Sequence, residues 1–394
     1  MERISGRKIL LTLFGVSFLM RLVFILTLEN RFYFPDEHEY FRMVENFLAG
    51  RGLIAGEHIK AYRPPLYPLF LSVLYFLRFN LTGVRIVQAL ISAGTVCLVF
   101  LTGKKLFSEK VGAVAAGISV FYPFFIYYTG FLLTETLFIF LVVLSFYFLI
   151  SMYGSEKPRD SAKAGFSIGL AGLCRPVMEL YLPVALVHVL AGKEDMKKKM
   201  KKIFITGLLF AITVSPWVIR NYRIFNSFIP GTTMGGWVFW EGNNPHSDGG
   251  PCHYFPEGIL EVEETERDRI LLRKTVEVIR ENPERFLWLL QNKFKRFWNV
   301  VPNAAEFSKT LYRVISVMSF GIMLPFFLLG FFLTLKDRKA QLIHSFIIFF
   351  TLFHMVFLAS IRYRVPLEPF YILFAVYGLF WIIERASCII KGKG

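Results

Sequence analysis

The sequence predicts an all-α fold, a polytopic bundle of about ten membrane-spanning helices. Hydrophobic residues make up 55% of the 394-residue chain, whereas soluble domains contain roughly 45–50%. Apolar runs of membrane-spanning length recur from one end of the chain to the other. Short basic stretches follow every second run, which is the pattern of loops that stay in the cytoplasm. We therefore expect a multi-pass membrane protein with both termini cytoplasmic.

The first run is too long for the core of a signal peptide, which has about 7–15 residues, and no cleavage site of small residues follows it. We divide the run 161–192 at Arg175-Pro176, because proline removes a helical hydrogen bond and arginine is costly in lipid. The expected spans lie at about 8–28, 84–103, 111–129, 136–152, 161–174, 177–192, 203–220, 313–335, 340–360 and 366–386.

The net charge of +16 would suit a nucleic-acid-binding protein if the chain were soluble. Here the lysines and arginines gather in the short loops of one side, so the positive-inside rule explains them and we expect no nucleic-acid partner. Of the four cysteines, three lie in apolar segments, which leaves no disulfide framework and predicts free thiols.

Two loops face the other side of the membrane, 29–83 and 221–312. In the first loop, apolar residues from Tyr40 to Leu48 recur at helical spacing and predict an amphipathic helix over 36–49 on the membrane surface. The apolar stretch 65–80 is interpreted as a second interfacial helix. We expect three parts: a catalytic transmembrane module with the first outer loop, an outer loop, and C-terminal membrane helices, at 1–220, 221–312 and 313–394.

Charged residues mark the expected outer ends of several spans. The stretch "FYFPDEHEYF" places Asp36 and Glu37 just beyond the first span, where acidic residues also suit the first turn of a helix. The later segments "LTETLF", "GLCRP" and "IRYRVPLEPF" lie near other outer span ends, "YRPPLYPLF" leads into the interfacial helix, and "GGWVFWEGNNP" lies in the second outer loop. They contain further candidates, namely Arg63, Glu135, Arg175, Trp240, Asn243, Asn244, Arg362 and Arg364.

The order and spacing of these segments resemble the glycosyltransferase C superfamily, in particular the protein O-mannosyltransferases and the transferase that adds aminoarabinose to lipid A. The resemblance implies transfer of a sugar from a polyprenyl-phosphate carrier to an acceptor, with inversion at the anomeric carbon and Asp36 as general base. In the aminoarabinose branch an acidic residue that helps to bind zinc stands where this chain has Tyr62. No cofactor is therefore expected, and a divalent metal has no support from the sequence.

The expected chemistry assigns each candidate a role. A carboxylate at Asp36 can take the proton of an attacking hydroxyl, and arginines can stabilise the charge of the leaving phosphate. For the phosphate we select Arg63, Arg175 and the pair Arg362 and Arg364, which could instead bind lipid headgroups. Glu37 and Glu135 are expected to contact substrate or its basic partners. Trp240, Asn243 and Asn244 are expected to contact the sugar from a loop, which could instead pack its aromatic rings on the membrane interface.

The expected function is thus a glycosyltransferase of the cell (plasma or inner) membrane, with a polyprenyl-phosphate sugar as donor. The acceptor, whether lipid, glycan or protein hydroxyl, is open. Two alternatives remain. A transporter or flippase of lipid-linked sugars should show internal repeats and ionisable residues at mid-membrane. A polysaccharide polymerase or ligase would share the large outer loop but is not expected to have an acidic pair after its first span.

Overall fold

The computed structural model describes residues 2–303 and 309–390, and the regular elements of this part of the chain are helices. One isolated antiparallel bridge joins Gly56 and Ile59. The predicted all-α fold is confirmed. Within these described residues, seven helical segments are long and apolar enough to cross a membrane. They are α1 (Glu2–Leu26), α4 (Leu81–Leu106), α7 (Glu135–Met152), α10 (Met196–Phe225), α14–η4–α15 (Thr310–Ser316, Val317–Gly321, Leu324–Leu333), α16 (Arg338–Val356) and α17–η5–α18 (Ile361–Arg364, Val365–Leu367, Glu368–Ile390).

A bent helix pair passes the same test only as a unit: α5 (Glu109–Phe121) with α6 (Pro123–Tyr127) and the short η1 (Tyr128–Gly130), bent by 56° at the break. Pro123 breaks the helix and leaves carbonyl groups at the end of α5 without helical donors. Arg21 of α1, fully buried, donates to two of them, the carbonyls of Ser119 and Val120, at 3.4 and 3.1 Å. The buried arginine therefore stabilises the bend.

The remaining two expected spans are the shorter helices α8 (Pro158–Cys174) and α9 (Val177–Leu190). The chain breaks between them at Arg175-Pro176, as predicted. Both helices run between the two ends of the bundle. Where α8 meets α9, Arg175 contacts Glu135 at the start of α7. At their far ends, Ser161 of α8 contacts α10 and His188 of α9 contacts the start of α16.

Small residues let several of these helices approach closely, which is typical of membrane helix pairs. A Cβ atom on Gly165 of α8 would lie 2.2 Å from the carbonyl oxygen of Thr206 in α10. A Cβ atom on Gly330 of α15 would lie 2.0 Å from the carbonyl oxygen of Phe374 in α18. Both pairs of helices are therefore in backbone contact.

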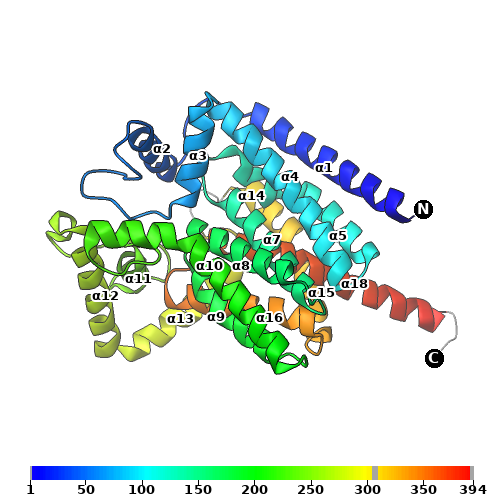
Figure 1. Cartoon of the computed structure of the whole chain (residues 1–394). Coiled ribbons are helices and arrows are strands. Elements are labelled where there is room, and N and C mark those ends of the chain that lie inside the picture. Colours follow the sequence, from blue (N-terminus) through cyan, green and yellow to red (C-terminus); the bar gives the residue numbers. More distant parts are fainter. Residues whose placement is uncertain (1, 304–308, 391–394) are drawn as a thin grey trace.

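The two ends of the bundle differ (Figure 1). The start of α1 and the end of α18 lie at one end, together with the basic stretches around Lys105, Lys157, Lys202 and Lys339, and we call this the lysine-rich end. The opposite end, which we call the site end, has a layer of shorter helices. These are α2 (Pro35–Leu48), α3 (Leu66–Phe76), α11 (Gly235–Asn243), η2 (Ile259–Glu261), α12 (Glu264–Glu281) and α13 (Pro283–Trp298).

The helices α2 and α3 match the two helices expected in the first outer loop. The stretch from Gly235 to Asn243 was expected to be a loop because of its glycines, and this expectation is wrong. A Cβ atom on Gly236 would lie 2.0 Å from the carbonyl oxygen of Asp268, and one on Gly242 would lie 1.8 Å from that of Phe357. The glycines therefore permit close packing of α11 against α12 and the end of α16.

Candidate functional site

The start of α2 is fixed in place by Glu37, the third residue of the helix. Its side chain is buried, and one carboxylate oxygen accepts hydrogen bonds from the backbone N–H groups of Tyr33 and Phe34 at 2.6 and 2.9 Å. The other oxygen accepts from the N–H of Leu132 at 2.8 Å. Because Leu132 precedes α7, this carboxylate ties α2 to the membrane bundle and sets the position of Asp36.

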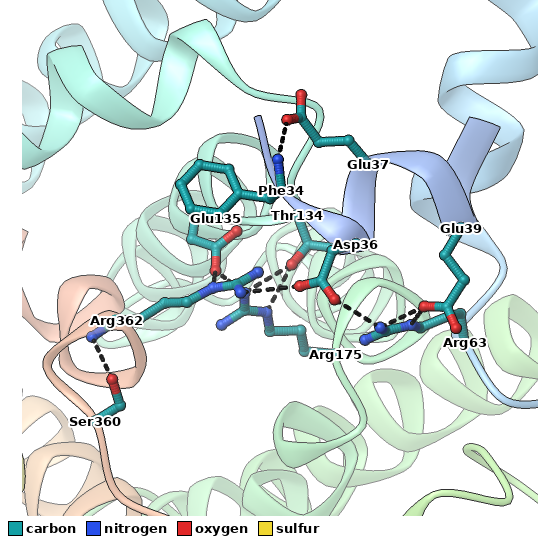
Figure 2. A network of polar contacts seen from close by, with 10 residues as sticks. All are labelled: Phe34, Asp36, Glu37, Glu39, Arg63, Thr134, Glu135, Arg175, Ser360 and Arg362. Carbon is teal, nitrogen blue, oxygen red and sulfur yellow. Dashed lines mark hydrogen bonds and ion pairs between the residues drawn. The ribbon is translucent and has the colours of Figure 1, made fainter. Parts of the chain in front are cut away.

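Asp36 lies between two arginines from distant parts of the chain (Figure 2). Its Oδ1 accepts a hydrogen bond from Arg63 Nη2 at 2.9 Å, and its Oδ2 accepts one from Arg362 Nη1 at 2.9 Å. Arg63 lies in the first outer loop, shortly before α3, and Arg362 lies at the start of the last span. The side chain of Asp36 is 26% exposed, so water or a substrate can reach it.

Glu135 forms the deeper part of the same cluster. It is fully buried at the start of α7, and its Oε1 accepts hydrogen bonds from Arg175 Nη2 at 2.6 Å and from Arg362 Nε. Arg175 also donates to the hydroxyl of Thr134 from Nε and Nη2, at 2.9 and 2.7 Å. Arg362 thus bridges Asp36 and Glu135, and both carboxylates depend on it.

Two residues of the cluster were not predicted, Glu39 and Thr134. Arg63 Nε donates to Glu39 Oε2 at 2.7 Å, so Arg63 also joins two carboxylates. Its guanidinium group lies over the rings of Tyr40 and Tyr62, with 5.4 and 5.2 Å to the centroids. These contacts hold Arg63 in one orientation, since a guanidinium group forms both charged and aromatic contacts.

Three arginines and three carboxylates therefore balance each other in the cluster. Burial acts to raise the pKa of Asp36, but the nearby Arg63 and Arg362 outweigh it and lower the pKa below its ordinary value. Burial acts to lower the pKa of Arg63, but Tyr40, Asp36 and Glu39 outweigh it and raise the pKa. Asp36 is thus ionised at neutral pH and ready to accept a proton, although its basicity is weakened.

The structure does not bring Glu37 or Arg364 into the cluster. Figure 2 shows Glu37 pointing away from Asp36, toward the N–H of Phe34. Arg364 is fully buried and paired with Glu368, 3.2 Å away. It also donates to the carbonyl groups of Phe297 and Asn299. In the described chain Arg362 and Arg364 therefore do not form the paired clamp that their spacing suggested.

The candidates of the second outer loop are buried within that region. Trp240 donates from Nε1 to the carbonyl oxygen of Tyr254 at 2.6 Å. Asn243 is buried and donates to the carbonyl of Val356, and its Oδ1 accepts from Lys293 Nζ at 2.7 Å.

The second asparagine of the pair has a similar setting. Asn244 is buried, and its Oδ1 accepts from the N–H of His246 at 3.0 Å. Its Nδ2 donates to the carbonyl of Cys252 at 3.2 Å. Trp240, Asn243 and Asn244 thus hold α11 and its following loop together, and these contacts do not place them beside Asp36.

A different residue of α11 faces the cluster. The carboxylate of Glu241, with 9% of its side chain exposed, lies 2.8 Å from Nδ1 of the exposed His253. The pKa of Glu241 is raised above its ordinary value, because the effect of burial outweighs the lowering by His253 and, more weakly, by Arg63. Glu241 was missed because the segment was expected to be a loop, and its nearness to Arg63 of the first outer loop depends on the fold.

The described residues contain no group of three or more His, Cys, Asp and Glu side chains that could hold a metal ion. At the position of the zinc ligand in the aminoarabinose branch, the ring of Tyr62 packs edge-on against Trp237, with centroids 6.2 Å apart. A phenol in an aromatic contact is a poor replacement for a zinc-binding carboxylate.

Residues 62–219 match the family model described as dolichyl-phosphate-mannose-protein mannosyltransferase. This stretch includes Arg63, Glu135 and Arg175. No curated protein sequence matches the chain.

Solved structures match nearly the whole chain. The oligosaccharyltransferase AglB from Archaeoglobus fulgidus, in complex with an inhibitory peptide and a dolichol-phosphate, is 14% identical with a TM-score of 0.60. The match covers 99% of this chain and 52% of AglB. ArnT from Cupriavidus metallidurans, bound to undecaprenyl phosphate, is 12% identical with a TM-score of 0.50, covering 95% of this chain and 59% of ArnT.

The chain has the fold of the glycosyltransferase C superfamily. The resemblance predicted from the sequence is confirmed at the level of the fold. The chain spans about half the length of the solved relatives that it matches. Its long apolar helices and this fold make it a multi-pass membrane protein.

Proposed function

We propose that the protein is an inverting membrane glycosyltransferase that moves a sugar from a polyprenyl-phosphate carrier to an acceptor hydroxyl. The observation that carries the proposal is the partly exposed Asp36 held between Arg63 and Arg362 at the site end. A base and phosphate-binding cations thus lie in one cluster. The AglB and ArnT structures contain a dolichol-phosphate and undecaprenyl phosphate, which supports this class of donor.

In the proposed reaction the acceptor oxygen attacks the anomeric carbon while the bond from that carbon to the phosphate oxygen breaks. The phosphate leaves with the electron pair, and Asp36 takes the proton of the hydroxyl. A positioned base contributes about 10²–10⁴-fold. Arg63, Arg175 and Arg362 stabilise the negative charge on the leaving phosphate through charged hydrogen bonds.

Donor binding would also strengthen the base. Arg63 and Arg362 lower the pKa of Asp36 while they contact it. A phosphate that draws the same arginines toward itself weakens this effect, and its own charge raises the pKa of the neighbouring carboxylate. Asp36 would then be a better base in the donor complex than in the free protein. Glu37 acts in this scheme as a positioning residue, since backbone N–H groups occupy its carboxylate.

The proposed orientation puts the lysine-rich end in the cytoplasm and the site end outside, by the positive-inside rule. Both termini are then cytoplasmic, and the protein lies in the plasma or inner membrane. After replacement of the native cysteines, an impermeant thiol reagent added to intact cells should label a cysteine at Glu45 in α2 but not one at Lys198. Labelling at position 198 alone would reverse the orientation.

The decisive experiment compares wild type and Asp36→Asn in liposomes with a panel of polyprenyl-phosphate sugars and acceptors. We expect the variant to lose about 10²–10⁴-fold in the rate of transfer. Glu45→Gln is the matched control, because Glu45 is an exposed carboxylate of the same helix. If Asp36→Asn transfers sugar as fast as wild type, Asp36 is not the base. Efficient direct use of nucleotide sugars would contradict the donor class.

A further inference from the structure

The lysine-rich end contains a cavity of about 330 Å³ where four helices end or begin. Met152 at the end of α7 and Val189 near the end of α9 form part of its apolar wall. Three cations lie around it: Lys193, Lys202 and Arg338. The cavity therefore combines an apolar wall with positive charge, at the end of a membrane bundle.

A second hollow, of about 170 Å³, adjoins the first and shares Lys202 with it. It lies between the start of α8 and the first turns of α10. Its cations are Lys157, Lys198, Lys201 and the shared Lys202. Together the two hollows have six cations against two carboxylates, Glu156 and Glu194. The pair is thus strongly positive, in contrast to the balanced cluster at the site end.

Several of these cations already have partners that explain them without a ligand. Lys202 Nζ donates to the carbonyl of Met152 at 3.0 Å and to Glu194. Arg338 donates to the carbonyl of Ala191. Both cations therefore cap the C-terminal ends of α7 and α9, where positive charge is favourable.

This capping does not account for all the positive charge. Lys193 and Lys201 are exposed, and among the described residues neither ammonium group has a hydrogen-bond or ion-pair partner. Among the described residues that line the larger cavity, Glu194 is the only carboxylate, and its side chain is 31% exposed. An anion at Lys202, which the two hollows share, would have Lys193 on the side of the larger cavity and Lys201 on the side of the second hollow, and could replace Glu194 beside Lys202.

We propose that these two hollows bind an anionic phospholipid of the leaflet at the lysine-rich end. The phosphodiester would lie among Lys193, Lys201 and Lys202, and the glycerol and first part of an acyl chain would lie along Met152 and Val189. Basic pockets between membrane helices favour anionic headgroups, and lysines suit them as mobile point charges. The apolar wall selects a lipid over a free phosphate ion. This inference is independent of the proposed transferase activity.

The test measures lipid retention by the full-length protein in detergent, using native mass spectrometry and thermal unfolding. The probes are phosphatidylglycerol, phosphatidylcholine of the same chain length, and inorganic phosphate. We expect phosphatidylglycerol to remain bound and to raise Tm, whereas the other two have little effect. Lys193→Gln/Lys201→Gln should bind phosphatidylglycerol about tenfold more weakly. Lys104→Gln/Lys110→Gln, which removes two exposed charges from the same end, should bind like wild type.

Three results would overturn the proposal. Equal retention of phosphatidylcholine would mean that headgroup charge is not recognised. Equal weakening by both double variants would mean that the hollows are not the site. Protection by inorganic phosphate as strong as that by phosphatidylglycerol would replace the lipid with a free anion.

Discussion

The two ends of the bundle use positive charge in opposite ways. At the site end, Arg63, Arg175 and Arg362 are each held by one or two carboxylates, and each is one-third exposed or less. At the lysine-rich end most of the cations are lysines, several of them exposed, and the cations outnumber the carboxylates. One end holds each of its three arginines against carboxylates, and the other leaves some of its lysine side chains without a partner among the described residues.

This difference fits two tasks, binding of a reacting phosphate at the site end and orientation of the chain in the membrane at the lysine-rich end. Arginine presents a planar set of donors that can hold two carboxylates at fixed angles, whereas lysine is a flexible point charge. A reacting phosphate needs donors that are already oriented. A membrane surface needs only net positive charge on the correct side. Each prediction below tests one side of this contrast.

The largest effect is expected from replacing Arg362, which donates hydrogen bonds to both Asp36 and Glu135. Arg362→Lys keeps the charge but cannot donate to Asp36 and Glu135 together, so we expect kcat/KM for the donor to fall about 10²-fold or more. Arg364→Lys, two residues away, is the matched control. It disrupts a buried pair outside the cluster, so it should lower Tm. Steady-state kinetics with a polyprenyl-phosphate sugar measure both variants. Equal losses of kcat/KM would contradict the view that Arg362 acts at the site and Arg364 only in folding.

A smaller effect is expected at the residue that positions α2. Glu37→Ala leaves the N–H groups of Tyr33, Phe34 and Leu132 without their acceptor, and each lost partner in a buried position costs about 1–3 kcal/mol. We expect a lower Tm and a lower kcat. Glu37→Gln retains one acceptor oxygen and should recover part of both. A variant with normal Tm and normal kcat would show that α2 does not depend on this anchor.

The pH dependence should reveal the arginines around Asp36. Its pKa is lowered in the folded protein, so the stability that it contributes is present above its ordinary pKa of about 3.9 and is lost as pH falls through the lower folded value. The acid limb of kcat/KM should therefore lie below about pH 4, and that of kcat at higher pH, because bound donor raises the pKa. Acid limbs at the same pH in both profiles would contradict competition between phosphate and Asp36.

The smallest effect is expected at the lysine-rich end. Lys198 pairs with Glu156, but both side chains are more than half exposed. Exposed ion pairs contribute little to folding. The Tm of Lys198→Ala in detergent should therefore equal that of wild type, and the difference between the two Tm values should change little with salt concentration. A large fall in Tm would mean that lysines at this end are held as firmly as the arginines of the site.

The sequence was informative where the physics is local. Arg175 and Pro176 predicted the break between α8 and α9, and the spacing of the apolar residues after Tyr40 predicted α2. Arg362 and Arg364 were grouped because the expected last span begins at 366, which puts both residues in the loop before it. In the structure both lie in the short helix α17, where residues two apart point about 200° apart.

Contacts between distant segments could not be predicted in the same way. Glu39 lies on the polar face of α2, where its spacing is that of a solvated residue, and only the fold brings Arg63 to it. The glycines of α11 indicated a loop because the sequence does not reveal that Asp268 and Phe357 approach them. Such contacts depend on tertiary packing, which overrides local preference.

The shortness of α8 and α9 has a consequence for the membrane itself. With 17 and 14 residues they are about 25 and 21 Å long, less than the roughly 30 Å of a typical hydrocarbon core. Leu180 and Val187 on α9 face outward, so the bilayer beside them must become thinner to match the short helix. A dip in the leaflet beside Arg175 would lower the polar headgroup layer toward the arginines. In the proposed complex, a prenyl chain then stays in the hydrocarbon core while its phosphate reaches the partly exposed arginines of the cluster.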